Sequence, residues 1–416
     1  MSIGKEWKER IKTYRDPVSG CPVSRLTSYL GHSSCHYFTD PFWIDGGKAF
    51  IFSSDRDGSS NLFRYDLREG RTTQLTDLPL PEDQEAGPHR YSGYTWEKTG
   101  KHYFWRDREL LELDIADGTL RTLYRLEEGS SSLGVSVTVT ADGRRICFGE
   151  RQESAIEKPA LGYDKPPEYL ETFERPPLSR ILTVDIADGR CAAIFEERCF
   201  LTHVNANPVR PELVTYCHEG PWARIDQRIW GLDIESGKNW RIRPQQGENR
   251  AAIGHEYWFA DGVHVGYHGR RLPREDAHFI GFCSYDNTVC VEYDFLPHCT
   301  HVGGRDADLF IVDGRPANVQ PWFPSERRPY IMLIRRRPGA AIADGAAGYE
   351  GPRVLALHRS TFNGQYAHPH ASLSPDGKRV IFTSDMEGYA QIYLAEIGDF
   401  ESLPEVPSPK AWNMDQ

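Results

Sequence analysis

The feature of this 416-residue chain that most restricts its fold is a repeated unit of turn, strand, turn and strand. In the clearest copy, Ser374-Pro375-Asp376-Gly377 leads into an apolar strand. An Asp-Gly pair supplies the positive φ of a tight hairpin, and apolar alternation on both sides is typical of half-buried strands. Seven copies recur at roughly 40–60 residues, and they begin near Ile44, Thr99, Ala141, Glu212, Ala260, Asp308 and Ser374.

Four-stranded sheets at this period predict an all-β, seven-bladed β-propeller. No long segment has helical periodicity, so we expect few helices and a single domain over residues 1–416. We expect the N-terminal segment around 12–30 to supply a strand that pairs with the last blade and closes the ring, because closure removes exposed sheet edges. Two stretches, 152–177 and 323–350, are predicted to be loop-rich insertions in the third and sixth blades.

The charge of the chain excludes one class of function. It has 49 Lys and Arg against 60 Asp and Glu, a formal net charge of −11. A nucleic-acid-binding protein needs a basic face that displaces counterions from phosphates. We therefore expect no nucleic-acid partner, although a local pocket can still attract small anions.

Targeting and redox signals indicate a cytoplasmic protein. Residues 1–12 are charged and lack the apolar run of a signal peptide, and no segment approaches the 18 apolar residues of a spanning helix. The nine cysteines show no C-x-x-C pair or regular framework. They are expected to be reduced and mostly buried thiols, as in a reducing compartment.

Several familiar catalytic motifs are absent. The segment Gly31-His32-Ser33-Ser34-Cys35 fails the nucleophile-elbow pattern at its last position. There is no P-loop and no G-x-G-x-x-G sequence, so nucleotide binding has no support.

The strongest chemical signal is Gln365-Tyr366-Ala367-His368-Pro369-His370. If this segment is a strand, His368 and His370 point to the same face. Neutral imidazoles suit borderline divalent metals, and an amide oxygen from Gln365 would favour a harder ion such as Mn²⁺. Pro369 restricts the backbone between the two histidines. The alternative is a pair of surface or turn histidines with no ligand role.

Further polar clusters lie at the entries to other units, and each has a structural alternative as a buried histidine or an ion-paired arginine. Because they occupy equivalent positions in successive blades, we expect them to converge on the mouth of one central channel. The clusters are Tyr216-Cys217-His218-Glu219-Gly220, Asp226-Gln227-Arg228-Ile229-Trp230, Gly254-His255-Glu256-Tyr257-Trp258 and His298-Cys299-Thr300-His301.

These motifs, in this order and spacing, resemble those of oligogalacturonate lyases. The opening segment from Tyr14 to Thr27 is also similar, so the resemblance runs over nearly the whole chain. It implies a cytoplasmic propeller that uses Mn²⁺, or another divalent cation, to cleave di- and trigalacturonate in pectin breakdown by β-elimination. By motif, it implies His301, Gln365, His368 and His370 as metal ligands, His255 as the base that removes the C5 proton, and Arg228 as a contact to the substrate carboxylate.

Two other interpretations stay open at this point. One is a non-enzymatic propeller that binds a sugar or a protein, and the other is a related lyase that acts on a different uronate. The sequence also leaves open the preferred metal and oligomer length, the quaternary state, the general acid, and any contribution of His298 or His218.

Overall fold

The computed structural model describes residues 2–79, 91–132, 137–152, 175–220, 225–272, 278–295, 299–314 and 329–407. Its contacts divide the chain into two compact units. The first comprises residues 1–100, 115–118 and 295–416, and the second comprises 101–114 and 119–294.

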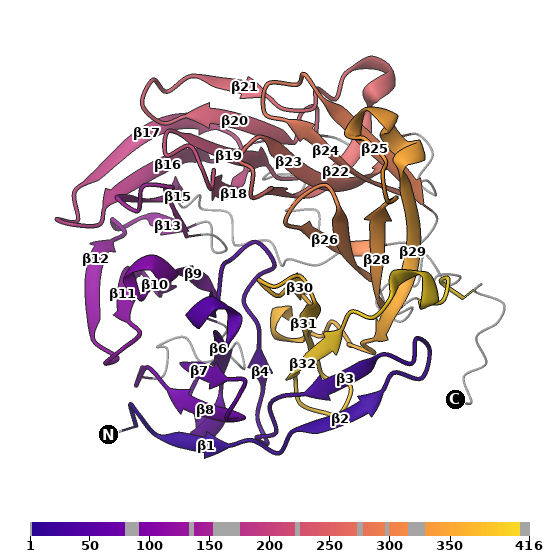
Figure 1. The fold of residues 1–416 in the computed structure, drawn as a ribbon. Coiled ribbons are helices and arrows are strands. Elements are labelled where there is room, and N and C mark those ends of the chain that lie inside the picture. Colours follow the sequence, from indigo (N-terminus) through magenta and orange to yellow (C-terminus); the bar gives the residue numbers. More distant parts are fainter. Residues whose placement is uncertain are drawn as a thin grey trace. The chain divides into compact units, whose positions relative to one another are not determined.

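The described residues form seven antiparallel sheets, one for each predicted repeat (Figure 1). In chain order the sheets contain β1 (Glu6–Lys8), β4 (Ser33–Ser34), β5 (Trp43–Ile44), β6 (Ala49–Ser54), β7 (Asn61–Asp66) and β8 (Arg71–Gln74); β9 (Gly93–Trp96), β10 (Lys101–Arg106), β11 (Glu109–Asp114) and β12 (Leu120–Arg125); β13 (Ser130–Ser132), β14 (Thr138–Val139), β15 (Arg145–Gln152), β16 (Leu178–Asp185) and β17 (Cys191–Arg198); β18 (Leu201–Ala206), β19 (Leu213–His218), β20 (Ile229–Asp233) and β21 (Asn239–Arg241); β22 (Ala251–Trp258), β23 (His264–Arg271), β24 (His278–Ser284) and β25 (Cys290–Phe295); β26 (Cys299–Gly304), β27 (Leu309–Gly314), β28 (Tyr330–Arg336) and β29 (Tyr349–Leu357); and β2 (Lys12–Arg15), β3 (Pro22–Arg25), β30 (Ser372–Leu373), β31 (Arg379–Ser384) and β32 (Gln391–Glu396).

The tight turns and paired strands expected from the sequence are present in these sheets. Gly377, in the turn before β31, has a φ of 71°, a value that glycine adopts at little cost. Strands β31 and β32 then pair in register from Arg379 opposite Glu396 to Ser384 opposite Gln391. Helical structure in the described residues consists of short 3₁₀ turns.

The cores of both units lie between neighbouring sheets. In the first unit, one apolar cluster joins the sheet of β31 to that of β28, and another joins it to that of β6. In the second unit, similar clusters join the sheet of β16 to that of β19, and the sheet of β20 to that of β23.

The N-terminal segment enters two sheets of the first unit. Figure 1 shows β3, in indigo, beside β32, in yellow; Val23 pairs with Ala395 and Arg25 with Tyr393. Strand β1 adds an outer strand to the first repeat through pairing with β8, a contact that the sequence analysis did not predict.

The two predicted insertions have different outcomes. Residues 153–174 of the first lie outside the described residues. Of the second, residues 323–328 also lie outside them, but Tyr330–Arg336 is strand β28 rather than loop. Its apolar run is buried because β28 lies between β27 and β29 in the interior of its sheet.

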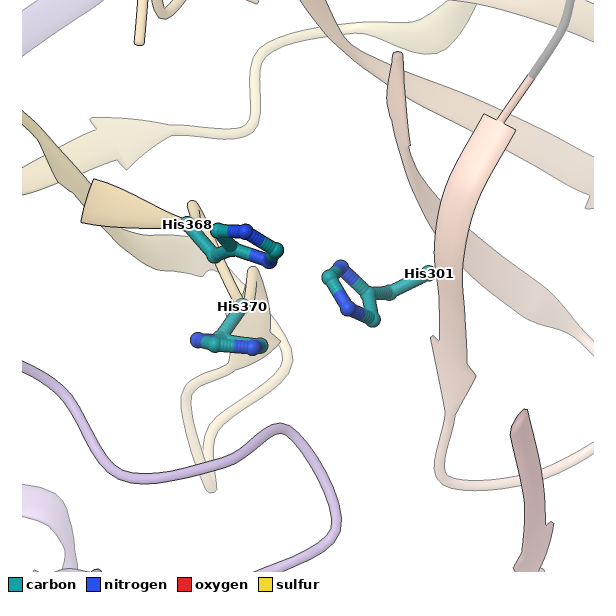
Figure 2. A group of neighbouring side chains, drawn as sticks. All are labelled: His301, His368 and His370. Carbon is teal, nitrogen blue, oxygen red and sulfur yellow. The ribbon is translucent and has the colours of Figure 1, made fainter. Parts of the chain in front are cut away.

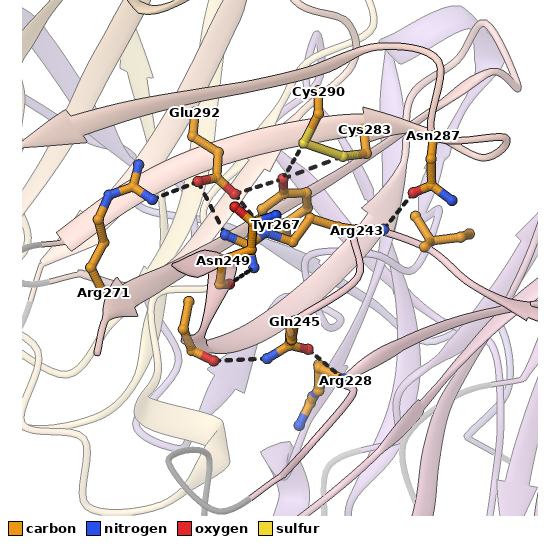
Figure 3. Close-up of polar contacts among 12 residues, drawn as sticks. Arg228, Arg243, Gln245, Asn249, Tyr267, Arg271, Cys283, Asn287, Cys290 and Glu292 are labelled. Carbon is orange, nitrogen blue, oxygen red and sulfur yellow. Dashed lines mark hydrogen bonds and ion pairs between the residues drawn. A yellow bond between two sulfur atoms is a disulfide. The ribbon is translucent and has the colours of Figure 1, made fainter. Parts of the chain in front are cut away.

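The expectation that all nine cysteines are reduced thiols is wrong for one pair. Cys283 at the end of β24 and Cys290 at the start of β25 form a disulfide with a Cα–Cα distance of 4.2 Å (Figure 3). Pairing of the two strands brings these positions together, although they are seven residues apart in the sequence. The described chain contains no helix that is both long and apolar enough to cross a membrane.

Candidate metal centre and candidate base

Three histidines of the first unit meet at one point. His301 lies on β26, whereas His368 and His370 lie just before β30, and Figure 2 shows the three rings turned toward one another. The ring centroid of His301 is 4.6 Å from that of His370 and 5.7 Å from that of His368. One nitrogen from each ring lies within 4.8 Å of the others. This spacing suits three ligands around one ion.

The orientation of His301 is fixed by a carboxylate on the neighbouring strand. A register shift between Cys299 and His301 re-aims the side chain, and Asp313 of β27 accepts hydrogen bonds from the His301 backbone N–H at 2.7 Å and from Nδ1 at 2.9 Å. Burial alone would raise the pKa of Asp313, but the charge and hydrogen bonds of His301 lower it below its usual value. An ionised Asp313 accepts the proton of Nδ1, which leaves the lone pair of Nε2 for a metal.

His368 and His370 are not on a strand, contrary to the sequence expectation. A 3₁₀ turn, η8 (Gln365–Ala367), precedes them, and β30 begins only at Ser372. Pro369 cannot donate to a sheet ladder, and His370 has a φ of 42°, in the left-handed region. The rings still stack, with centroids 5.4 Å apart, because this irregular backbone turns both toward His301.

Gln365, the fourth predicted ligand, begins η8, and its side chain is exposed. The donor set of the other three residues fits a divalent ion such as Mn²⁺, Fe²⁺ or Zn²⁺, because all three can offer neutral imidazole nitrogens. An amide oxygen from Gln365 would be a hard fourth ligand.

Arg228 lies in the second unit, inside a buried cluster of charges. Its side chain is 1% exposed, and its Nε and Nη1 lie 3.1 Å and 3.0 Å from oxygens of Glu256 and Glu219. Burial lowers the pKa of Arg228, but the neighbouring Cys217, Glu219 and Glu256 outweigh it and raise the pKa well above its usual value. The backbone N–H of Arg228 also donates to Gln245 Oε1 at 2.5 Å (Figure 3). The guanidinium is therefore charged and held in one orientation.

His255, also in the second unit, is positioned by a β-bulge and by a second histidine. It has a φ of 58° and lies where the register between β22 and β23 shifts, between Gly254 and Tyr257. Bulges re-aim a side chain relative to its strand. Nδ1 of His255 lies 2.7 Å from Nε2 of the buried His268, so one ring donates to the other.

The remaining histidines named from the sequence lie elsewhere or outside the described residues. His218 lies in the second unit with its Nε2 3.2 Å from Glu197. His298 falls outside the described residues.

Sequence reasoning missed the supporting residues Asp313 and His268, and it named Glu219 and Glu256 within the quoted clusters without giving either a role. Glu219 and Glu256 are adjacent to quoted motif histidines, so their proximity was a usable signal. Asp313 and His268 reach the site through strand pairing, which residue spacing alone does not reveal.

Seven antiparallel sheets and a buried three-histidine centre define the class of protein as a seven-bladed β-propeller with a candidate metal site. The family model of oligogalacturonate lyase matches residues 1–401. The chain therefore belongs to the oligogalacturonate lyase family, and it is an enzyme of the lyase class.

Individual relatives resemble the chain over almost its full length. It is 27% identical to the oligogalacturonide lyase of Pectobacterium atrosepticum and 26% identical to the oligogalacturonate lyase of Dickeya dadantii, in each case over 96% of this chain and 99% of the relative. A solved oligogalacturonate lyase in complex with manganese has the same fold, with a TM-score of 0.81, 22% identity, and 96% and 99% of the two chains covered.

Proposed function

We propose that this protein is a Mn²⁺-dependent oligogalacturonate lyase that cleaves short galacturonate oligomers, such as di- and trigalacturonate, by β-elimination. The observation that carries the proposal is the cluster of His301, His368 and His370 in a chain of this family. The manganese complex of a similar lyase supports the choice of metal.

The three histidines would hold the ion, with Gln365 as a fourth ligand through its amide oxygen. When bound, a divalent cation supplies Lewis acidity that draws negative charge from a uronate carboxylate and so makes the adjacent C5 proton easier to remove. Asp313 keeps His301 in the tautomer that can bind a cation.

Arg228 would contact a carboxylate of the substrate. Its ion pairs with Glu219 and Glu256 fix the plane of the guanidinium before the substrate arrives. A preoriented guanidinium loses little freedom when it binds a carboxylate, and its paired N–H donors match the two oxygens.

His255 would accept the C5 proton as general base. If Nδ1–H of His255 donates to Nε2 of His268, the lone pair of His255 Nε2 is available for the proton. The electrons of the C5–H bond form the C4=C5 double bond, and the C4–O bond breaks. The departing oxygen takes up a proton and becomes a hydroxyl group, which leaves an unsaturated uronate on the other fragment.

The test is incubation of the full-length protein with di- and trigalacturonate, with and without a chelator, followed by the ultraviolet absorbance of the unsaturated product. We expect activity that chelation abolishes and Mn²⁺ restores. Activity that resists exhaustive chelation would contradict the metal role, and turnover of another uronate in preference to galacturonate would contradict the substrate.

Variants separate the proposed roles. His301→Ala should lose metal-dependent activity, and His255→Asn should lose about 10²–10⁴-fold in kcat, the usual contribution of a general base. His268→Gln should lower kcat less, with little change in KM and a shifted pH profile. The control is His264→Ala, because the His264 side chain pairs with the exposed Asp261 and has no role in the proposed reaction.

A further inference from the structure

A second group of metal-ligating side chains lies in the second unit. The proposed reaction does not use it, and of its three members only His218 belongs to a motif named in the sequence analysis. It consists of Glu197, Cys199 and His218, which offer a carboxylate oxygen, a sulfur and an imidazole nitrogen within 4.8 Å of one another. We propose that these three residues form a Zn²⁺ site that joins β17 to β19.

Backbone hydrogen bonds fix the positions of these three residues. Glu197 and His218 lie at the ends of β17 and β19, and His218 pairs with Leu201 in the ladder of β18 and β19. The Cys199 N–H donates to the carbonyl of Glu197 at 3.2 Å, and the Cys199 carbonyl accepts from Ser179 Oγ at 2.7 Å. The site is therefore built on strand ends and one tight connection.

The separations suit a small tetrahedral ion. Zn²⁺ binds nitrogen and oxygen at about 2.0–2.2 Å and sulfur at about 2.3 Å, so tetrahedral ligands lie about 3.3–3.8 Å apart. The Nε2 of His218 is 3.2 Å from Glu197 Oε2, and the sulfur of Cys199 lies within 4.8 Å of one ring nitrogen and one carboxylate oxygen of these two residues. Small side-chain rotations would complete the site, with water as a fourth ligand.

The ligand types favour a different metal from the three-histidine centre. A thiolate is a soft ligand that Zn²⁺ accepts well, whereas Mn²⁺ prefers oxygen and imidazole.

A bound ion would tie the outer strand of the third repeat to the fourth repeat. His218 is followed directly by Glu219, which makes an ion pair with Arg228. The proposed ion would therefore fix the end of β19, next to the Glu219 that orients this arginine. It would also stabilise the packing between the sheets of β16 and β19, where Val214 and Tyr216 lie.

Cobalt substitution tests the proposal, because thiolate coordination to Co²⁺ gives a sulfur-to-metal charge-transfer band that histidine and glutamine ligands cannot give. Metal-free full-length protein titrated with Co²⁺ should show this band, and one equivalent of Zn²⁺ should remove it. The band should persist in His301→Ala, which disables the other metal centre, and in Cys191→Ser, which removes an exposed cysteine.

The charge-transfer band should vanish in Cys199→Ser. In His218→Ala the band should appear only at higher Co²⁺ concentration, with an apparent Co²⁺ affinity at least tenfold lower than that of the wild type. Thermal unfolding followed by circular dichroism establishes that each variant is folded. Zn²⁺ should raise the Tm of His301→Ala, in which the three-histidine centre is disabled, but not that of the double variant His301→Ala/Cys199→Ser. Absence of the band in the wild type, or its survival in Cys199→Ser, would overturn the proposal without touching the lyase assignment.

Discussion

At the scale of single residues, the three-histidine centre depends on a partner that is not itself a ligand. Asp313 accepts from both the backbone N–H and Nδ1 of His301, so it fixes the position and the tautomer of that ring. Such partners fix the tautomer and the ring orientation of a ligating histidine, and their loss weakens metal binding.

The first prediction is that Asp313→Asn lowers metal affinity by about 10–100-fold. The amide oxygen of Asn can still accept from the His301 backbone, but its NH₂ group then faces Nδ1. That donor stabilises the wrong tautomer, with the proton on Nε2. Calorimetric titration with Mn²⁺ measures the change, and Asp376→Asn on an exposed turn should leave the affinity unaltered.

The second prediction concerns the buried ion pair of Arg228. Glu256→Gln removes one of its two carboxylates without changing the volume, so the free energy of unfolding should fall by about 1.5–3 kcal/mol, the usual worth of a hydrogen bond to a charged group. Glu235→Gln, which breaks an exposed pair with Arg145, should cost less than about 1 kcal/mol. Equal losses in urea unfolding would show that burial does not set the energy of the Arg228 pair.

The chemistry of individual residues was only partly predictable from sequence. His301, His368 and His370 were identified as companions, and the structure brings them together. The backbone that does so was predicted wrongly, because a left-handed residue and a β-bulge leave no periodic signature. Asp313 is twelve residues from His301 and becomes its neighbour only through strand register.

At the scale of elements, the sheet of β31 is completed by strands from the far end of the chain. Val23 on β3 is fully buried, pairs with Ala395 and packs into the apolar cluster that joins two sheets of the first unit. Adjacent Ser24 is only half-buried, and its Oγ lies 2.8 Å from Thr13 Oγ1 near the surface.

The third prediction follows from this contrast. Val23→Ala should lower the free energy of unfolding by about 2 kcal/mol, since it removes two buried methyl groups and leaves a small cavity. Ser24→Ala on the same strand should change it by less than about 0.5 kcal/mol. Urea denaturation measures both, and a small effect of Val23→Ala would mean that β3 contributes little to the stability of its sheet.

The elements themselves were the most predictable feature. Turn residues and apolar alternation are local, so each of the seven repeats could be located from a short window of sequence. Strand β28 was mistaken for loop because the arginines that follow it and the Gly/Ala run of 339–348 outweighed its short apolar stretch. Strand β1 was missed because three residues, two of them exposed, carry no pattern that differs from a loop.

At the scale of the whole molecule, buried histidines make stability depend on pH. Burial lowers the pKa of His102 from 6.5 to about 3 and that of His358 to about 4. Below pH 6.5 the unfolded chain takes up protons at these residues while the folded chain does not. The unfolded state is thereby favoured as the pH falls, and this trend ends only where the folded histidines also become protonated.

The fourth prediction is that the free energy of unfolding decreases from pH 6.5 to pH 5 by about 2 kcal/mol for each of these histidines. In His102→Phe, which keeps a buried ring of similar size, the decrease should be about 2 kcal/mol smaller than in the wild type. Urea unfolding at several pH values measures it. Parallel pH profiles for the two proteins would contradict the prediction.

The pairing of β3 with β32 also has a consequence for how the protein is made. Strand β3 (Pro22–Arg25) leaves the ribosome long before its partner β32 (Gln391–Glu396). At ~5–20 residues per second, the interval is roughly 20–75 s. During that time the apolar face of β3 lacks its sheet, so the nascent chain carries an open edge on which a chaperone or a neighbouring chain can act. The sheet of β31 therefore cannot be completed until β32 has been synthesised, although its strands β2 and β3 precede most of the others.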